Sequence, residues 1–242
     1  MIYLYTDFGY EGPYVGQMKA VLARLAPKVP VIDIMHDAPV CDPKRATYLL
    51  AALAQKSEFG DVWLCVVDPG VGSERLPVVL DCGGVTFVGP NNGLFELIHR
   101  RVNGATLGQI AWQPDIMSAT FHGRDLFAPV AAWTAIGEDV ETAVIDPAEP
   151  RPGVDWPDDL AEIIYIDAYG NLVTGIGGSA LTDDQKIAGA GRTMKYARTF
   201  SDVPEGKLFW HRNSMGLIEI AANRACANQA LDLQVGDSIK IF

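Results

Sequence analysis

The chain has 242 residues, of which 49% are hydrophobic and 20% are charged, so it can bury a sizeable core in one large domain or two smaller ones. Its 19 Lys and Arg against 30 Asp and Glu give a net charge of -11, which disfavours general binding to nucleic acid or to an anionic membrane surface. A local basic pocket for a small anion is compatible with that balance.

The sequence carries no sign of a membrane span or of a secretory leader. Its longest apolar stretches fall far short of the ~20 residues that a span needs, and the first residues lack the basic region of a signal peptide. The four cysteines are scattered, with no C-x-x-C pair and no histidine at zinc-ligand spacing. We therefore expect a soluble cytoplasmic protein with reduced thiols and no metal.

Strands and helices alternate over roughly the first 140 residues, the pattern of an α/β layered domain. Apolar alternation predicts a strand at 2–6, and apolar residues three or four apart predict a helix between Pro13 and Pro27. Asp42-Pro43 favours the start of a second helix, because Asp caps it and Pro fits its first position. We expect further strands at 31–35 and 62–67, a hairpin of 78–80 with 85–88, and helices at 94–101 and 126–136, the last capped by Asp125 and closed by Gly137.

The composition changes after this domain. Residues 138–162 hold nine acidic residues, four prolines and one basic residue, which indicates a solvated linker. We place the domains at 1–145 and 160–242, with 146–159 as the linker. Beyond the linker we expect short strands and no convincing helix, the pattern of a small all-β domain of barrel-like form. The expected strands are 163–166, 172–176, 192–200, 208–211, 217–221 and 238–242.

Three polar clusters interrupt the apolar pattern, at residues 6–9, 68–75 and 120–125. Each lies at the end of a predicted strand or the start of a predicted helix, where open α/β sheets place their ligand sites. Structural roles compete with this interpretation, because Asp68 suits a turn and Asp125 suits a helix cap.

Signatures of two common nucleotide-binding classes are incomplete. The tripeptide Asp7-Phe8-Gly9 matches the metal-binding motif of kinases, yet the glycine-rich loop and the catalytic-loop spacing are missing. The chain has no Walker sequence and no G-x-G-x-x-G after a strand. A kinase and a dinucleotide dehydrogenase are therefore disfavoured.

Taken in chain order, the clusters and the segments around them form an extended set of motifs. The set comprises T-D-F-G (6–9), Y-V-G-x-M-K (14–19), V-V-D-P-G-V-G-S-x-R (66–75), F-V-G-P-x-N-G-L (87–94), T-F-H-G-R-D-x-F-A-P (120–129), I-D-x-Y-G-N-L-V-T (166–174) and N-S-x-G-x-I-E-I-A (213–221). It closely resembles the S-adenosylmethionine (SAM) hydroxide adenosyltransferases, the hydrolase relatives of the fluorinase and chlorinase. The resemblance spans essentially the whole chain.

The resemblance implies a Rossmann-like N-terminal domain, a barrel-like C-terminal domain and a homotrimer whose ligand lies between the first domain of one subunit and the second of its neighbour. It implies hydrolysis of SAM to adenosine and L-methionine without a cofactor. The residues that match the hydrolytic positions of the family are Asp68, Arg75 and His122. Those that match its substrate-binding positions are Asp7, at the ribose hydroxyls, with Asp167, Asn171, Ser214 and Glu219.

Three residues depart from the family pattern. Asn91 stands where aspartate is common, Tyr169 where phenylalanine is usual, and Gly175 where asparagine is expected. In the halogenases the segment that corresponds to 66–75 lacks the Asp-to-Arg pattern, and tyrosine replaces the histidine. The sequence therefore resembles the water-using branch, and the departures bear on substrate contacts rather than on the class of reaction.

The residue types suit attack of water on the ribose C5′ atom. A neutral thioether leaves the sulfonium, so the leaving group needs neither a proton nor a metal. Arg75 can stabilise developing hydroxide, His122 can take or relay a proton, and Asp68 can orient either group or bind the water, so the identity of the proton acceptor stays open. At the methionine end, Asp167 suits the ammonium and Ser214 suits the carboxylate.

Other functions stay open beside this hypothesis. A 5′-halogenase of the same superfamily would form 5′-chloro-5′-deoxyadenosine from SAM and chloride. A non-catalytic adenosine or SAM sensor would bind its ligand and leave it intact. A metal-dependent hydrolase that uses the Asp and His residues would be inactivated by a chelator.

Overall fold

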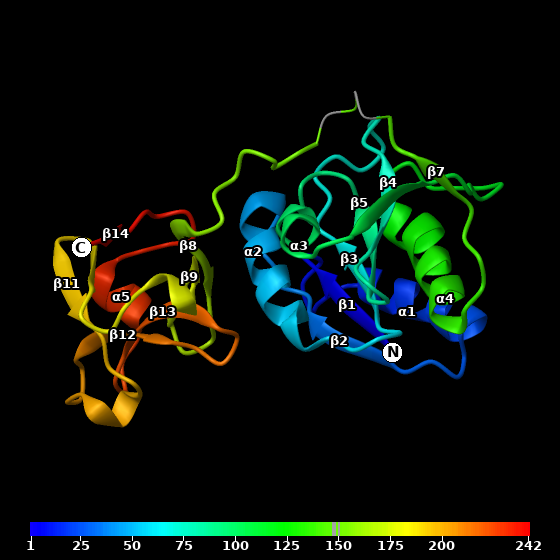
Figure 1. Cartoon of the computed structure of the whole chain (residues 1–242). Coiled ribbons are helices and arrows are strands. Elements are labelled where there is room, and N and C mark those ends of the chain that lie inside the picture. Colours follow the sequence, from blue (N-terminus) through cyan, green and yellow to red (C-terminus); the bar gives the residue numbers. More distant parts are fainter. Residues whose placement is uncertain (147–148, 150) are drawn as a thin grey trace. The chain divides into compact units, whose positions relative to one another are not determined.

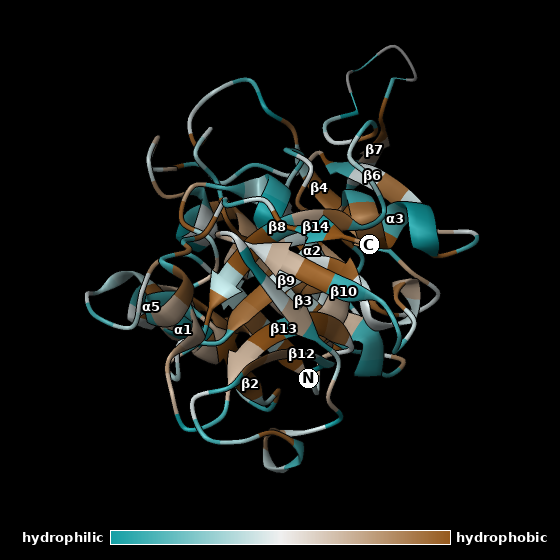
Figure 2. Cartoon of the chain, turned by 90° about the vertical axis from the view of Figure 1, so that its left-hand side faces the viewer, coloured by the Kyte–Doolittle hydropathy of each residue, from teal (hydrophilic) through white to brown (hydrophobic). Residues whose placement is uncertain are grey.

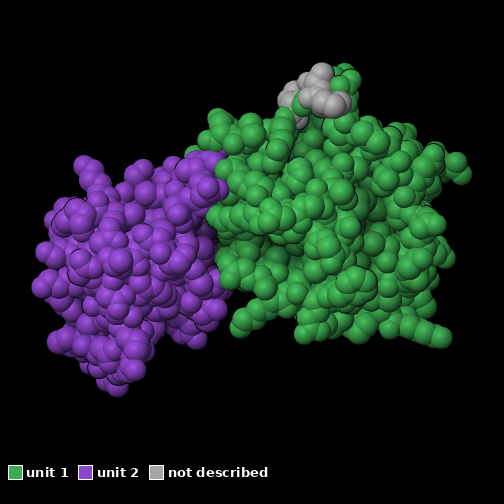
Figure 3. Space-filling view, in the orientation of Figure 1, with its two compact units in different colours: residues 1–155 green, residues 156–242 purple. Residues whose placement is uncertain are grey.

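The computed structural model describes residues 1–146, 149 and 151–242. It divides into two compact units, Met1–Asp155 and Trp156–Phe242 (Figure 3). The division falls within the predicted linker 146–159, of which residues 147, 148 and 150 lie outside the described residues. In the described part of the chain, every helix is too short or too polar to cross a membrane.

A seven-stranded mixed sheet forms the centre of the first unit, with the strand order β2-β1-β3-β5-β4-β6-β7 (Figure 1). The strands β2, β1, β3 and β5 are parallel neighbours, whereas β4, β6 and β7 pair antiparallel. All five residues of β3 are buried, as expected for a strand covered on both faces. The strands are β1 (Ile2–Thr6), β2 (Val31–Met35), β3 (Val62–Val66), β4 (Pro77–Asp81), β5 (Thr86–Pro90), β6 (Thr106–Ile110) and β7 (Thr142–Val144).

Helices cover both faces of this sheet. The helices α1 (Tyr14–Leu25) and α4 (Ala128–Ile136) pack against each other on one face, and α2 (Pro43–Leu53) and α3 (Glu96–Arg101) lie on the other (Figure 1). A 3₁₀ turn, Ala54–Lys56, follows α2. The predicted cap of α2 is confirmed, because the Asp42 carboxylate accepts the Arg45 N–H at 3.0 Å.

The start of α4 differs from the prediction. A π turn, Gly123–Phe127, precedes it, so Asp125 lies inside a helical turn and does not cap one. The Asp125 carboxylate instead accepts the backbone N–H of Ser118 at 2.8 Å. The end was predicted correctly, because Gly137 adopts a left-handed φ of 78°.

The second unit contains two antiparallel sheets, β12-β13-β9-β8 and β11-β10-β14. Isolated bridges pair Glu162 with Ser238 and Tyr196 with Trp210, so the edges of the two sheets meet on both sides in a barrel-like arrangement around the buried Trp210. The strands are β8 (Leu160–Ile166), β9 (Leu172–Gly177), β10 (Lys186–Gly189), β11 (Arg192–Lys195), β12 (Leu208–Arg212), β13 (Leu217–Ala222) and β14 (Lys240–Ile241).

Parts of the second unit were predicted wrongly. The strand expected over 192–200 ends at Lys195, and a 3₁₀ turn occupies Phe200–Asp202. A second 3₁₀ turn, Gly178–Ala180, and the short helix α5 (Ala227–Leu231) were not predicted. Figure 2 shows apolar positions along the strands and polar positions in the loops of the chain. The predicted class, an α/β domain with a smaller β domain of barrel-like form, is confirmed.

Candidate active site

The first unit carries its polar clusters at the carboxyl ends of β1 and β3, which are parallel neighbours with Thr6 opposite Val66. In the sheet, β2 lies on one side of β1 and β3 lies on the other. The connections that leave these neighbouring strands therefore run in opposite directions across the sheet, which makes this position a topological switch point. Open α/β sheets bind ligands in the crevice at such a switch point. Asp7 follows β1 directly and Asp68 lies just beyond β3, so the topology brings two predicted site residues to that crevice.

Arg75 joins Asp68 to His122. Its Nε lies 3.0 Å from both carboxylate oxygens of Asp68, and its Nη2 donates a further hydrogen bond to Oδ2. The same Nη2 lies 3.0 Å from Nδ1 of His122. The turn after β3 returns Arg75 to Asp68, with Val71 N–H donating to the Asp68 carbonyl at 3.2 Å. The structure therefore brings the three predicted hydrolytic residues together.

The segment before His122 packs tightly against this turn. Gly72 has a φ of +80°, and a Cβ atom there would lie 2.5 Å from the carbonyl oxygen of Ala119. Glycine is therefore required at this position, both for its backbone conformation and for the close approach. The π turn Gly123–Phe127 begins directly after His122, and π turns often occur at functional sites.

The pair formed by Asp68 and Arg75 is removed from solvent. The Asp68 side chain is 4% exposed and that of Arg75 is 9% exposed. The guanidinium carbon lies 5.1 Å from the centre of the Phe127 ring, so one face of the cation packs on an aromatic surface. Loss of either partner would leave an unpaired buried charge, which is strongly destabilising.

The contacts of His122 indicate its protonation state. Because the guanidinium can only donate, Nδ1 accepts from Arg75 and the ring proton lies on Nε2. Burial lowers the pKa of His122, the positive charge of Arg75 lowers it further, and Asp68 acts in the opposite direction. The ring is therefore neutral, with its Nε2–H as a donor.

The Asp7 carboxylate is held by a backbone group. Its Oδ2 accepts the N–H of Cys41 at 2.9 Å, and Cys41 itself adopts a left-handed φ of 53°. Burial raises the pKa of Asp7, the Cys41 hydrogen bond opposes that shift, and the negative charge of Asp68 adds to it. Asp7 is thus a partly desolvated carboxylate with acceptor capacity for a ligand.

Asp7, Asp68 and His122 line a cavity of about 620 Å³. Arg75 contacts Asp68 and His122 but does not itself line the cavity. Aromatic rings form the apolar part of the wall, with the rings of Tyr14 and Phe121 centred 5.5 Å apart. Asp7, Phe8, Tyr14, Asp68, Phe121 and His122 are among the residues that line the cavity.

Sequence reasoning missed two residues that line this cavity. Arg124 stacks over Phe121 at 5.0 Å, donates to Gln17 Oε1 at 2.8 Å and pairs with Asp125, whose pKa is lowered mainly by that contact. Arg124 lies in the 120–129 motif, and this position in the sequence could have identified it as a site residue. Cys41 was missed because it acts through its backbone N–H, which no residue pattern reveals.

The second unit has a separate cavity of about 860 Å³. All four substrate-binding candidates of that unit line it, namely Asp167, Asn171, Ser214 and Glu219. Asp167 Oδ1 accepts the backbone N–H groups of Tyr169 and Asn171, and Oδ2 accepts the Asn171 side-chain amide, each at 2.9 Å. The Asp167 carboxylate therefore shapes the β8–β9 turn and keeps one acceptor site on Oδ2.

Glu219 is a buried carboxylate in the wall of the same cavity. Its Oε1 lies 3.1 Å from Nε2 of His211, its partner across the β12–β13 pair, and its Oε2 accepts the Asn213 side-chain amide at 2.9 Å. Sequence reasoning missed His211 and Asn213 as site residues. Asn213 lies in the 213–221 motif, whereas His211 is recognisable only once the strand register is known.

The structure accounts for part of the departures from the family pattern. A Cβ atom at Gly175 would lie 2.7 Å from Cβ of Leu160 on the neighbouring strand β8, so this chain needs glycine there. Tyr169 lines the cavity of the second unit and is 78% exposed, so it is free to contact a ligand. Nothing in the structure explains Asn91.

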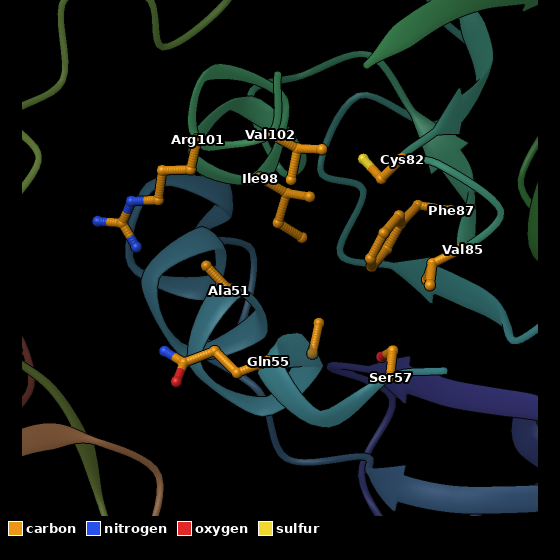
Figure 4. A pocket seen from close by; sticks show the side chains of 10 residues that line it. Ala51, Gln55, Ser57, Cys82, Val85, Phe87, Ile98, Arg101 and Val102 are labelled. Atoms are coloured by element: carbon orange, nitrogen blue, oxygen red, sulfur yellow. The ribbon is translucent and has the colours of Figure 1, made fainter. Parts of the chain in front are cut away.

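A further hollow, of about 220 Å³, lies between α2, the β4–β5 hairpin and α3 (Figure 4). Its lining is mostly apolar, with Phe87, Ile98 and Val102 on one side. The Cys82 thiol at its edge has its pKa raised to about 11, mainly by burial, and is therefore protonated and unreactive near neutral pH. Of the residues that the structure describes, no carboxylate or histidine lines this hollow, and its polar lining residues are Gln55, Ser57, Cys82 and Arg101. Among the described residues, no three His, Cys, Asp or Glu side chains are grouped to hold a metal.

Comparisons with known proteins identify the family of the chain. The sequence models of the SAM hydroxide adenosyltransferase N-terminal and C-terminal domains match residues 2–144 and 161–240. A curated (R)-S-adenosyl-L-methionine hydrolase of Thermus thermophilus is 36% identical over 100% of this chain and 99% of the relative, and one of Salinispora arenicola is 37% identical over 98% and 95%. A fluorinase of Nocardia brasiliensis is more distant, at 22% identity over 98% and 94%.

Solved structures show the same fold. A crystal structure of an uncharacterised conserved protein from Thermotoga maritima has a TM-score of 0.83 and 30% identity, covering 100% of this chain and 99% of the other. A conserved hypothetical protein from Thermus thermophilus has a TM-score of 0.78 and 34% identity, with the same coverage. Together with the matches over both domains, these similarities show that the chain belongs to the SAM hydroxide adenosyltransferase family.

Proposed function

We propose that the protein hydrolyses SAM to adenosine and L-methionine by attack of water on the ribose C5′ atom. The observation that carries the proposal is the contact of Arg75 with both Asp68 and His122 beside the cavity that contains Asp7. Curated relatives named (R)-S-adenosyl-L-methionine hydrolase support it.

Activation of the nucleophile is the difficult part of this reaction. The sulfonium leaves as a neutral thioether, so the C5′–S bond breaks without a proton donor. Water is a poor nucleophile, and in-line positioning against C5′ supplies much of the rate, since a well-oriented reactant can gain ~7–11 kcal/mol. The site must therefore hold one water and accept its proton as the new C–O bond forms.

The geometry favours Asp68 as the proton acceptor. Nδ1 of His122 is occupied by Arg75, so the ring offers an Nε2–H donor and no free lone pair. Asp68 faces the cavity, and its Oδ1 keeps acceptor capacity beside the Arg75 Nε contact at 3.0 Å. In this scheme Arg75 fixes the carboxylate, and the His122 donor with the Arg75 charge stabilises the hydroxide-like oxygen.

Substrate recognition is divided between the two units. Asp7 receives the two ribose hydroxyls, because one carboxylate can accept both donors. In the second unit, Asp167, Asn171, Ser214 and Glu219 contact the methionine part or the nucleoside, with Asp167 suited to the ammonium group.

We further propose a homotrimer in which the first domain of one subunit and the second domain of its neighbour complete each site. An Asp68→Asn chain, which lacks turnover, can be unfolded and refolded together with a chain that carries both Asp167→Asn and Glu219→Gln. At a SAM concentration far below the raised KM of the second chain, the mixture should be more active than either chain alone. Light scattering should give the mass of three chains. A monomer, or no gain of activity in the mixture, would contradict this arrangement.

Chromatography of SAM incubated with the purified protein, chelator and chloride tests the proposed reaction. We expect adenosine and methionine in equal amounts, with no cofactor and no loss of rate on chelation. A 5′-chloro-5′-deoxyadenosine product would indicate a halogenase, and intact bound ligand would indicate a sensor. Inactivation by the chelator would indicate a metal-dependent hydrolase. The cytoplasmic location and the absence of nucleic-acid and membrane partners stay predictions from the sequence.

A further inference from the structure

A chain of polar contacts that begins at the exposed side chains of Lys19 and Asp33 and ends at buried ones lies next to the Asp7 motif, outside the catalytic group. Thr6 Oγ1 lies 2.8 Å from His36 Nδ1, and both side chains are buried, with exposed fractions of 0% and 2%. His36 Nε2 lies 3.2 Å from Asp33 Oδ1, and Asp33 Oδ2 accepts Lys19 Nζ at 2.9 Å. Nothing in the proposed reaction uses these residues.

The contacts define the proton positions in this chain. A lone pair on His36 Nε2 would repel the Asp33 carboxylate, so Nε2 carries the ring proton even though its N–H is not aligned for a good hydrogen bond. In the neutral ring, Nδ1 then accepts the Thr6 hydroxyl proton. The Thr6 oxygen in turn accepts the Phe8 N–H at 3.3 Å, so the hydroxyl uses both its donor and an acceptor site.

The backbone around His36 holds the same motif at two more points. Gly9 N–H donates to the His36 carbonyl at 2.6 Å, and Ala38 N–H donates to the Thr6 carbonyl at 3.1 Å. Three residues further on, Cys41 N–H donates to the Asp7 carboxylate. The 36–41 segment therefore fixes the residues on both sides of Asp7 as well as the carboxylate itself.

From these contacts we propose that His36, together with Thr6, is a positioning residue for the proposed reaction. It orients the Asp7 carboxylate toward the ribose without touching substrate, since His36 and Thr6 do not line the cavity. The Asp33–His36–Thr6 order resembles a nucleophilic triad, but the Thr6 oxygen is inaccessible to substrate, which excludes that chemistry. The proposal rests on the proposed function only in naming the ribose as the ligand of Asp7.

Two variants remove the central contact: Thr6→Val with little change in volume, and His36→Phe with a somewhat larger apolar ring in place of the imidazole. Thr6→Val and His36→Phe should each raise the KM for SAM and the Kd for adenosine about tenfold, the scale of one lost buried hydrogen bond, while kcat changes less than about threefold. Thr6→Ser keeps the hydroxyl and should restore affinity. Thr47→Val is the matched control, because Thr47 is equally buried and its hydroxyl makes no hydrogen bond in the described part of the chain.

A double-mutant cycle separates positioning from a structural role. In an Asp7→Asn background, Thr6→Val should weaken adenosine binding by less than about twofold, because the group that it orients no longer carries the interaction. A full tenfold effect in that background would overturn the proposal. So would a lower melting temperature of Thr6→Val with unchanged adenosine affinity.

A ligand-free measurement keeps this test independent of turnover. Selective ¹⁵N-cysteine labelling gives one amide signal for each of the four cysteines, and the Cys41 signal is the one lost in Cys41→Ser. It should move in Thr6→Val and return in Thr6→Ser, since its N–H donates to Asp7. An unmoved signal would overturn the positioning role, whereas wild-type protein that releases no adenosine from SAM would contradict only the proposed function.

Discussion

The polar groups of the two units are organised in opposite ways. In the first unit a buried cation, Arg75, is shared between Asp68 and His122, so that its charge acts on the cavity wall. In the second unit, backbone N–H groups and a side-chain amide hold the Asp167 carboxylate, and the Asn213 amide and the His211 ring hold that of Glu219. A buried charge beside a cavity can stabilise a charged transition state. Carboxylates that are held by hydrogen bonds keep spare acceptor sites, which can bind a substrate.

This difference gives an expected division of kinetic effects. A change in the group formed by Asp68, Arg75 and His122 should lower kcat, because interactions made only in the transition state act on turnover. A change in the second cavity should raise KM and leave kcat nearly unchanged.

Arg75→Ala should lower kcat about 10²–10³-fold, the scale of losing one group that stabilises transition-state charge. It should also lower the melting temperature, because Asp68 stays buried without its partner. Arg75→Lys keeps the positive charge but loses the planar guanidinium that donates to two partners at once, so it should recover stability more than activity. Turnover per folded molecule, with adenosine affinity as a reference, checks this. A near wild-type kcat in Arg75→Ala would remove the basis for assigning catalysis to the first unit.

His122→Ala should lower kcat about 10²-fold, the scale of losing one hydrogen-bond donor to developing negative charge. Burial lowers the pKa of His122 from its ordinary 6.5. As the pH is lowered, kcat/KM should therefore stay constant down to pH 6.5 and decrease only below it. The neutral ring contributes stability that is complete above the unfolded pKa and is lost as the pH falls through the folded one. His122→Asn keeps an acceptor for Arg75 and should lack this acidic limb. If kcat/KM decreased at acidic pH in the same way in the wild type and in His122→Asn, the titrating group would be another residue.

Asp7→Asn should weaken adenosine and SAM binding about tenfold or more through the loss of charged acceptors, with a smaller effect on kcat. Burial raises the pKa of Asp7, so its charged form destabilises the fold at neutral pH, and this cost is relieved as the pH falls through the raised pKa. The variant should therefore melt at a higher temperature than the wild type while it binds more weakly. Calorimetric titration and thermal melting measure both. A lower melting temperature would show that Asp7 supports the fold instead.

Glu219→Gln should have the smallest effect, raising the KM for SAM about tenfold while kcat stays within about threefold. The amide keeps the shape of the side chain and loses the charge that faces His211. Asp184→Asn, at an exposed site outside the cavity, removes the same charge and should change neither constant. A large drop in kcat for Glu219→Gln would place chemistry in the second unit.

The elements that carry the site were predictable because local signals agree there. The apolar runs of β1 and β3, each followed by an aspartate, placed Asp7 and Asp68 at the same sheet edge, and the Asp42 cap fixed the start of α2. The motif resemblance added Arg75 and His122, whose contact spans 47 positions of sequence and has no local signature.

Other features depend on tertiary contacts that residue patterns do not carry. The role of His36 comes from a pairing with Thr6 across 30 positions. Aspartate is a common helix-capping residue, but the carboxylate of Asp125 accepts the backbone N–H of Ser118 instead. The strand expected over 192–200 ends early because residues beyond Tyr196 turn into a 3₁₀ segment after a single bridge to Trp210.

The central claim is that water attacks the ribose C5′ atom, and isotope labelling tests it most directly. Hydrolysis of SAM in H₂¹⁸O with chelator present should place the heavy oxygen in the 5′-hydroxyl of adenosine and none in methionine, as mass spectrometry of both products can show. The Arg75→Ala variant run in parallel excludes a contaminating hydrolase. Adenosine without the label, or label that enters only by a later exchange, would contradict the account.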